Sequence, residues 1–320
     1  MRLDRRTLLA ALAAAPLPAH AGVAPDADER YRLAYAAAEA SRGPDRKLLP
    51  RLPEPVAARL REGQVLFVGG LLKQITQALS AILAQPIGLT GYFGEQIDAL
   101  KAQGIATHDL DVHSEADIET NAATIAAAIR AAPGPVTLVT HSKGSLDTLA
   151  ALMSEPDLCT PRRVRGWVSL QAPFYGSPLA DLNTGDAVRR EITSYLLEKG
   201  FGGSPDTLLE LRVSSRRIYQ RVHASAIRSV VAAVPTVCYG SDLAEGQLSL
   251  FRISWLICGL AGEPRNDGLV GVHSARLPGA TMVTETGVEV FTLGATEALQ
   301  LETPQPQPVA DPLLRAGALF

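Results

Sequence analysis

The stretch "VTLVTHSKGSLDTLAAL", residues 136–152, runs from a strand into a helix through the turn His-Ser-Lys-Gly. Valine and threonine dominate its first five residues and favour a buried strand, whereas the apolar residues that follow the turn have helical spacing. A serine at such a junction, here Ser142, projects from the edge of the sheet on a strained backbone and is a candidate nucleophile. Gly144 gives the turn the room it needs, but Thr140 is larger than the first glycine of the usual G-x-S-x-G pattern.

Strands and helices alternate on both sides of this turn. The segments "QVLFVGG" (64–70) and "VRGWVSLQAP" (164–173) have the apolar composition of buried strands, and "IATHDLDV" (105–112) has the alternation of a strand. Amphipathic helices are expected between them, and the one before residue 136 opens with Ser114 as its expected N-cap. This order predicts an α/β fold with a mostly parallel central sheet and helices on both of its faces.

The carboxyl ends of the expected strands bring several loops to one rim of the sheet. Ligands of parallel sheets bind beyond these ends, and Gly69-Gly70, Ser142 and "APFYGSP" (172–178) all follow a strand. Residues 178–231 interrupt the alternation with a helical, amphipathic segment, which we interpret as a cap over this rim. The apolar segment "ISWLICGL" (253–260) fits either a helix or a strand.

The two ends of the chain differ in composition from its middle. The first 21 residues combine Arg5-Arg6, an Ala/Leu-rich stretch and a small-x-small end, which predicts a twin-arginine export signal cleaved after Ala21. We therefore expect an exported protein, periplasmic or secreted. Residues 22–60 are predicted as a helical lead-in, residues 61–300 as the main domain and the Pro-rich residues 301–320 as a tail.

Composition and charge argue against several classes of function. The chain has 320 residues, 47% of them hydrophobic, and a net charge of −3, which suits one large core. It has no basic stripe typical of a nucleic-acid binder, and short pairs such as Arg216-Arg217 are expected on solvated helix faces. No Cys/His spacing predicts a zinc site. Cys159, Cys238 and Cys258 allow either one disulfide, Cys238–Cys258 being the favoured pair, or unpaired buried thiols.

Five segments together resemble the bacterial true lipases, a family within the α/β-hydrolases, over about residues 62–295. The resemblance implies an α/β-hydrolase fold, a lid formed by residues 178–231, and a lipid or ester small molecule as substrate. It also implies transient contact of the cap with a lipid or membrane surface. The five segments are "VLFVGGLL" (65–72), "GYFGEQIDALKAQGI" (91–105), "VTLVTHSKGSLDTLAAL" (136–152), "VSLQAPFYGSPLADL" (168–182) and "NDGLVGVHSARLPGA" (266–280).

The same resemblance assigns roles to single residues by position. Ser142 is the nucleophile and Asp267 is the acid of the triad, and the backbone N–H groups of Leu71 and Lys143 form the oxyanion hole. The family's oxyanion loop has His-Gly where this chain has Gly69-Gly70. The family also implies a structural calcium ion near the acid, whose ligands this sequence does not identify, and no cofactor.

The histidine of the triad is missing from its expected place. In the family it lies about twenty residues after the acid, in a segment like Gly-Val-Asp-His, where this chain has Gly287-Val288-Glu289-Val290. Val290 therefore stands where the imidazole belongs, and no histidine follows His273. His273 lies in the same loop as Asp267 and is the remaining candidate for the base. Without a base, a serine hydrolase loses rate by a factor on the order of a million.

Two functions from different classes follow from this sequence. The first is a serine hydrolase of the lipase/esterase type, which cleaves carboxylic esters through an acyl-enzyme on Ser142. The second is a catalytically degenerate α/β-hydrolase that keeps the pocket and cap and binds a lipid or acyl ligand.

Overall fold

The computed structural model describes residues 52–70, 93–113, 116–184, 209–247, 249 and 251–287. Within these residues, six parallel strands form one sheet in the order β2-β1-β3-β4-β5-β6. The strands are β1 (Gln64–Val68), β2 (Ala106–Leu110), β3 (Val136–His141), β4 (Val164–Leu170), β5 (Thr236–Asp242) and β6 (Thr281–Thr286). The helices are α3 (Glu54–Arg61), α5 (Gly94–Lys101), α6 (Ile118–Ala131), α7 (Lys143–Ser154), the 3₁₀ turn η1 (Pro156–Leu158), α8 (Pro178–Thr184), α11 (Val213–Val222), α12 (Ala224–Ala233) and α13 (Arg252–Leu260).

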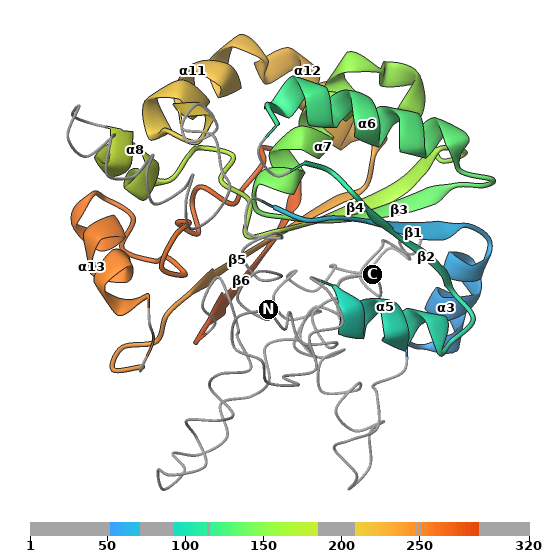
Figure 1. The fold of residues 1–320 in the computed structure, drawn as a ribbon, viewed down its shortest axis with the longest axis horizontal. Coiled ribbons are helices and arrows are strands. Elements are labelled where there is room, and N and C mark those ends of the chain that lie inside the picture. The colour runs from blue at the N-terminus through green and yellow to red at the C-terminus, as the bar shows by residue number, and fades with distance from the viewer. Residues whose placement is uncertain are drawn as a thin grey trace, which may run out of the picture.

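Helices cover both faces of this sheet, as the sequence predicts (Figure 1). Helices α3 and α5 lie on one face, whereas α6, α7 and α12 lie on the other. The central strand β3 is buried at each of its residues, and β1 is buried from Val65 to Val68. Strands covered on both faces lose the polar alternation of half-exposed strands, which explains their continuous apolar runs.

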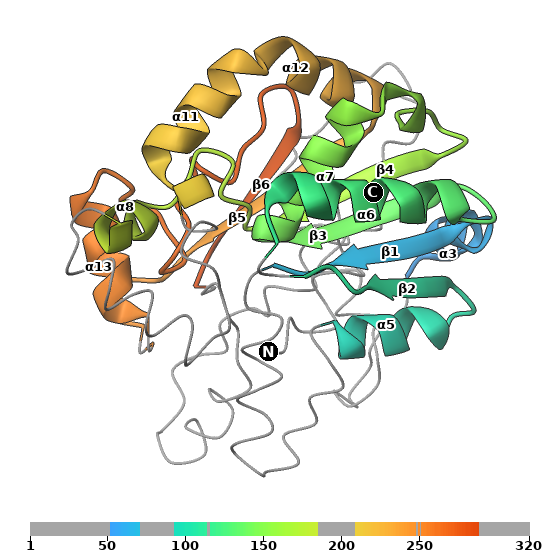
Figure 2. The same ribbon diagram turned by 45° about the horizontal axis from the view of Figure 1, so that its top comes forward.

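The connections between the strands change direction at one point of the rim. The chain leaves β1 towards β2 and then returns past β1 to form β3, so connections on the two sides of this point run in opposite directions. Figure 2 shows β4, β3, β1 and β2 side by side, with β1 next to β3. A parallel sheet binds ligands beyond the carboxyl ends of its strands at such a switch point. Here these ends lead into Gly69-Gly70 and Ser142.

Two details differ from the expectations drawn from the sequence, and one open alternative is resolved. Helix α6 begins at Ile118 and its N-cap is Asp117, not Ser114, because the Asp117 carboxylate accepts a hydrogen bond from the Thr120 N–H at 2.6 Å. The ambiguous apolar segment around residue 255 is the helix α13. Arg216 is 2% exposed, so it does not lie on a solvated helix face.

Several predictions fall on residues outside the described ranges. These are the export signal, most of the lead-in, residues 185–208 of the cap, Leu71, Val290 and the Pro-rich tail. They stay predictions. In the described ranges, none of the helices has the length and apolar character that crossing a bilayer requires.

Candidate active site

Ser142 lies in a sharp turn between β3 and α7. Its backbone has φ 52° and ψ −129°, a conformation that costs a non-glycine residue about 1–3 kcal/mol. The turn is held by the Ser142 N–H, which donates to the Leu170 carbonyl at 3.0 Å, and by the Ser145 N–H, which donates to the Ser142 carbonyl at 3.0 Å. The side chain is half-buried at the carboxyl rim of the sheet, so the hydroxyl is presented rather than packed away.

The loop after β1 touches this turn. A Cβ placed on Gly70 would lie 2.7 Å from the Ser142 Cβ and 3.2 Å from the Lys143 nitrogen, and a Cβ placed on Gly144 would lie 2.5 Å from the Gly69 carbonyl oxygen. These distances are too short for a side chain at either position. Gly70 and Gly144 therefore allow the two loops to approach each other.

Thr140 occupies the position where G-x-S-x-G has its first glycine, and it is fully buried. Its hydroxyl lies 2.7 Å from the Ser145 hydroxyl and accepts a hydrogen bond from the Trp167 indole N–H at 2.9 Å. The larger side chain is thus accommodated by polar partners beneath the turn. This departure from the pattern leaves the turn conformation intact.

Lys143 has two separate roles in the geometry. As the first residue of α7, its N–H has no acceptor within the helix and borders Gly70 at the rim. Its side chain is 1% exposed, and its ammonium donates to the Asp147 carboxylate and to the Ala116 carbonyl, both at 2.9 Å. A Ser-Lys dyad is therefore not formed, since the ammonium is engaged behind the turn.

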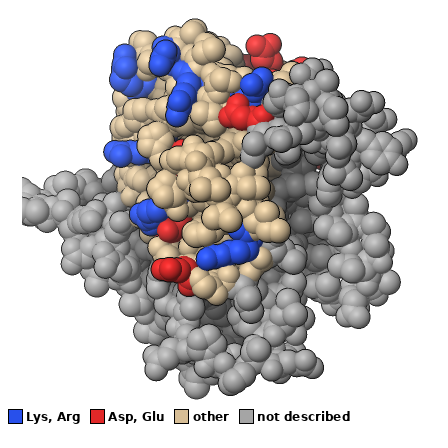
Figure 3. All heavy atoms as spheres, turned by 90° about the vertical axis from the view of Figure 1, so that its left-hand side faces the viewer, with Lys and Arg blue, Asp and Glu red and all other residues tan. Residues whose placement is uncertain are grey.

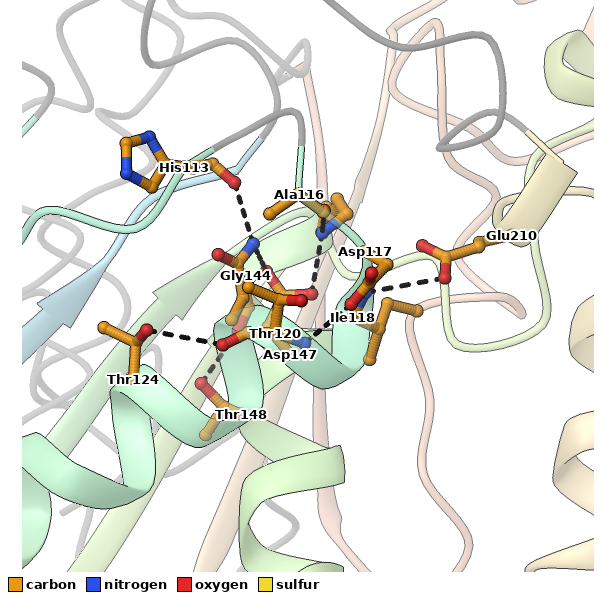
Figure 4. Close-up of polar contacts among 12 residues, drawn as sticks. His113, Ala116, Asp117, Ile118, Thr120, Thr124, Gly144, Asp147, Thr148 and Glu210 are labelled. Atoms are coloured by element: carbon orange, nitrogen blue, oxygen red, sulfur yellow. Dashed lines mark hydrogen bonds and ion pairs between the residues drawn. The ribbon is translucent and has the colours of Figure 1, made fainter.

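Asp147 is the centre of this buried polar cluster (Figure 4). Its second oxygen accepts a hydrogen bond from the Asn121 amide at 3.0 Å, and that amide also donates to the His113 carbonyl at 2.9 Å. Burial raises the pKa of Asp147 to about 6, although Lys143 acts in the opposite direction. Neither Asp147 nor Asn121 is predicted from the sequence as part of the site. The spacing of Lys143 and Asp147, one helical turn apart, was the available signal.

Asp267 is 1% exposed in the loop that follows α13. Its carboxylate accepts hydrogen bonds from the N–H groups of Leu269 at 2.9 Å and Val270 at 2.8 Å. The neighbouring Asn266 donates to the Trp255 carbonyl at 3.1 Å and to the Glu263 carbonyl at 2.8 Å, so the loop is attached to α13. Backbone N–H groups thus hold this acid in a fixed orientation.

The loop of Asp267 and the "APFYGSP" segment lie together. The Ser177 hydroxyl donates to the Leu269 carbonyl at 2.6 Å, and the Ser274 hydroxyl donates to the Gly176 carbonyl at 2.6 Å. Because β4 is next to β3 in the sheet, these contacts place the acid loop at the same rim as Ser142.

The same loop is braced by a charged pair. The Arg265 guanidinium donates to both carboxylate oxygens of Asp242, at 3.2 and 3.1 Å, and the Thr286 hydroxyl donates to Asp242 at 2.9 Å. This fork joins the loop to the ends of β5 and β6. Within the described ranges, no three His, Cys, Asp or Glu side chains form a group that could hold a metal ion. The expected calcium ion stays a prediction.

His141 does not serve as a base. It is fully buried, its ring nitrogen lies 3.1 Å from the Gln171 side-chain oxygen, and burial lowers its pKa to about 4. Gln171, whose backbone also has a positive φ of 48°, donates onward to the Ser241 hydroxyl at 2.6 Å. The neutral imidazole therefore belongs to a polar chain beneath the rim.

His273 is exposed, and its ring packs 5.3 Å from the ring of Tyr175. It also acts electrostatically on Glu263, whose pKa burial raises and His273 lowers. His108 and His113 are exposed, and the ring of His223 packs on an aromatic ring of α11. Across the described ranges, no histidine forms a hydrogen bond with the Ser142 hydroxyl.

All three cysteines are free thiols, so the alternative of unpaired thiols holds and the Cys238–Cys258 disulfide is absent. Burial raises the pKa of both Cys238 and Cys258 to about 12. Neither thiol is a nucleophile near neutral pH, because the thiolate is the reactive form.

Comparison with solved structures identifies this architecture. The chain superposes on the metagenomic carboxyl esterase MGS0156 with a TM-score of 0.64, over 96% of this chain and 94% of the esterase, at 20% sequence identity. The chain has the α/β-hydrolase fold. The mature lipase BlEst2 of Bacillus licheniformis shares this fold with a TM-score of 0.54, over 76% of this chain and 93% of the lipase, at 21% identity. No model of a known protein family matches the sequence, and no curated protein matches it either.

The turn at Ser142 joins a central strand to the helix that follows, which is the geometry of a strand-turn-helix elbow. At identities of about one fifth, the similarity to these structures establishes the fold alone. The chemistry has to be argued from the residues of this chain.

Proposed function

We propose that this protein is a hydrolase of carboxylic esters that acts through Ser142. The observation that supports it most directly is the strained Ser142 backbone, with φ 52°, in contact with the glycine loop after β1. Strain of this kind persists only where the surrounding structure imposes it, and it is concentrated at functional sites. Two glycines that permit a close approach to one serine are the second support.

The proposed reaction has two stages. The Ser142 hydroxyl attacks the ester carbonyl, the alcohol leaves and an acyl-enzyme forms, which water then hydrolyses. Negative charge develops on the carbonyl oxygen in both stages. The N–H of Lys143, at the positive end of α7, and the N–H of Leu71 would stabilise that charge. Asp267, held by the N–H groups of its own loop, would orient the base.

The reaction also needs a proton acceptor for the Ser142 hydroxyl. His273 is the candidate base that the sequence offers, and it would have to turn from the ring of Tyr175 towards Ser142. The second candidate function is a degenerate hydrolase that binds a lipid or acyl ligand without cleaving it. Val290 at the expected histidine position and the absence of a hydrogen bond between Ser142 and any described histidine favour this second candidate.

Labelling with a fluorophosphonate separates the two functions, since only an activated serine reacts readily. The ester hydrolase requires labelling of the wild type and none of Ser142→Ala. If His273 is the base, His273→Ala loses labelling, whereas the control His223→Ala, which removes another histidine packed on an aromatic ring, keeps it. A wild type that does not react while it binds a fluorescent fatty acid would assign the second function.

Restoration of the histidine is a further test of the degenerate state. Val290→His is expected to raise esterase activity if Val290 fills the place of the base. A folded variant with unchanged turnover would contradict the positional match.

Export is part of the same proposal and rests on the first 21 residues. Expression in a bacterium followed by N-terminal sequencing of the protein outside the cytoplasm is expected to give Gly22 as the first residue. Arg5→Lys/Arg6→Lys should keep the protein inside the cell, because twin-arginine export depends on this pair. Export of that variant, or cleavage elsewhere, would refute the assignment.

A further inference from the structure

A cluster of three buried hydrogen-bonding side chains lies directly beneath the Ser142 turn. The Thr140 hydroxyl lies 2.7 Å from the Ser145 hydroxyl, and the Trp167 indole N–H donates to the Thr140 hydroxyl at 2.9 Å. The Thr140 hydroxyl in turn donates to the Val168 carbonyl at 3.4 Å. The proposed reaction uses none of these groups. Buried polar groups with satisfied hydrogen bonds specify one arrangement of the backbone around them.

The donors and acceptors of this cluster have one assignment that satisfies every group. An indole N–H can only donate and a backbone carbonyl can only accept, so Thr140 accepts from Trp167 and donates to Val168. A hydroxyl has one donor and two acceptor sites. The Ser145 hydroxyl therefore donates to the acceptor site of Thr140 that is left. The Thr140 hydroxyl is fully used, and it is the centre of the cluster.

The bond between Thr140 and Ser145 closes the turn across its base. Thr140 lies near the end of β3 and Ser145 in the first turn of α7, so the two side chains meet from the two sides of Ser142. The Ser145 N–H also donates to the Ser142 carbonyl at 3.0 Å. The closed segment contains the strained backbone of Ser142, with φ 52°. Such strain persists only where the surrounding structure imposes it, and this bond is part of that structure.

Trp167 attaches the Thr140 end of this bond to the neighbouring strand. In the sheet, Thr140 pairs with Ser169, and Trp167 lies two residues before Ser169 on the same face. Its indole therefore reaches Thr140 as a diagonal neighbour across the two strands. The indole ring packs edge-on against the Phe174 ring, with centroids 6.0 Å apart and planes at 90°. Packing thus fixes the direction of the indole N–H.

Solvent cannot replace a lost partner in this cluster. Figure 3 shows the side of the molecule that carries α8 and α13, where charged side chains of the described residues lie at the surface and can exchange partners with water. Thr140, Ser145 and Trp167 are each 0% exposed. Loss of the Thr140 hydroxyl would therefore leave two buried donors without their acceptor, which is costlier than the loss of a hydrogen bond at the surface.

We propose that Thr140 is a positioning residue, whose hydroxyl closes the base of the turn and imposes the backbone conformation that presents Ser142. In this chain the threonine at the first glycine position of G-x-S-x-G supplies a bond that glycine cannot make. The N–H of Lys143 lies inside the closed segment and is positioned by the same bond. The inference rests on the proposed function in one respect, since it assigns Thr140 an effect on the reactivity of Ser142.

Indole signals in proton–nitrogen correlation spectra of the full chain test the geometry without any catalysis. The chain has two tryptophans, and the buried Trp255 indole N–H has no hydrogen-bond partner among the described residues, so it is an internal reference. We expect Thr140→Val, which keeps the shape and removes the hydroxyl, to move the Trp167 indole proton upfield and to leave that of Trp255 in place. Thr140→Ser keeps the hydroxyl and should keep the Trp167 signal downfield. An unmoved Trp167 signal in Thr140→Val would overturn the inference.

Amide hydrogen exchange tests whether the bond holds the turn. In Thr140→Val, exchange of the N–H groups of residues 142–145 should become about tenfold faster, because two buried donors lose their acceptor. The control Thr148→Val removes an equally buried hydroxyl of α7, which donates to the Gly144 carbonyl at 2.8 Å, and should leave this exchange unchanged. Ser145→Ala breaks the closing bond from the α7 side and should also speed the exchange, so it decides the question if Thr140→Val does not fold. Equal exchange in the closing-bond variants and the control would overturn the inference.

Fluorophosphonate labelling connects the turn to reactivity. If the wild type is labelled, Thr140→Val should react about tenfold more slowly because its nucleophile is misplaced, whereas Thr140→Ser and Thr148→Val should react at the wild-type rate. Labelling of Thr140→Val at the wild-type rate would overturn the inference. A wild type that is not labelled would refute the ester hydrolase proposal by itself, and the indole and exchange measurements would then decide whether Thr140 holds the turn.

Discussion

Replacement of Lys143 by methionine should make the stability of this protein depend on pH in a new range. The substitution keeps the length of the buried side chain and removes the charge that faces Asp147 at 2.9 Å. Lys143 and Asp147 are each 1% exposed, so solvent cannot take over the role of either partner. Breaking a buried pair on one side generally costs about 3–5 kcal/mol. The pH dependence of the free energy of unfolding reports on this pair more specifically than the overall loss of stability does.

The size of this pH dependence follows from the pKa of Asp147. In the folded wild type the pKa of Asp147 is about 6, against about 3.9 in an unfolded chain, because burial outweighs the attraction of Lys143. The folded chain therefore binds an extra proton between about pH 4 and pH 6. The free energy of unfolding should fall by about 3 kcal/mol as the pH rises through that window, and this group adds no slope above it.

Without the ammonium, the pKa of Asp147 rises further and the folded variant keeps its proton above pH 6. Its free energy of unfolding should then continue to fall above pH 6 relative to the wild type, by at most about 1.4 kcal/mol per pH unit. Urea unfolding at pH 5, 6, 7 and 8, followed by circular dichroism, measures this difference. The double variant Lys143→Met/Asp147→Leu removes the titrating group and should show neither slope. A constant difference between Lys143→Met and the wild type from pH 6 to pH 8 would refute the reasoning.

Three further predictions concern the rim. Ser142→Gly should raise the free energy of unfolding by about 1 kcal/mol in chemical denaturation, because glycine adopts φ 52° without strain, and a loss of stability would contradict the strain. Gly70→Ala should abolish fluorophosphonate labelling with the circular dichroism unchanged, because its Cβ would lie 2.7 Å from that of Ser142; full labelling would mean that the loop is not held there. Arg265→Gln should speed amide hydrogen exchange in residues 263–270 and cost about 1 kcal/mol, since it removes the fork to Asp242, and unchanged exchange would show that the fork is not a brace.

The sheet and the elbow could be predicted because their sequence signals are local. A β-branched run, a His-Ser-Lys-Gly turn and an apolar helix are adjacent in the chain, and the alternation of such units fixes a parallel sheet. The rim position of Gly69-Gly70 follows from the same order.

Features that depend on packing between distant segments could not be predicted in this way. Helix α6 begins at Ile118 because the Asp117 side chain accepts the hydrogen bond from the Thr120 N–H. Ser114 is another residue that could have capped the helix, and the sequence alone does not decide between the two. Arg216 reads as a solvated residue in sequence, yet its guanidinium donates to the Phe174 carbonyl at 3.3 Å in the interior. Asn121 is 26 residues from Asp147, and nothing local indicates that they meet. The choice of base also needs the spatial neighbours of Ser142, which a sequence pattern does not supply.

The polar cluster behind the elbow has a consequence for protein engineering. The pentapeptide around Ser142 cannot be transplanted as a self-contained module, because its lysine would arrive in a foreign scaffold without the carboxylate one turn later and the carbonyl of Ala116. A recipient protein that lacked both groups would have to bury the lysine ammonium without an ion-pair or hydrogen-bond partner. Donor segments taken from this chain should therefore include the start of α6 together with the first two turns of α7.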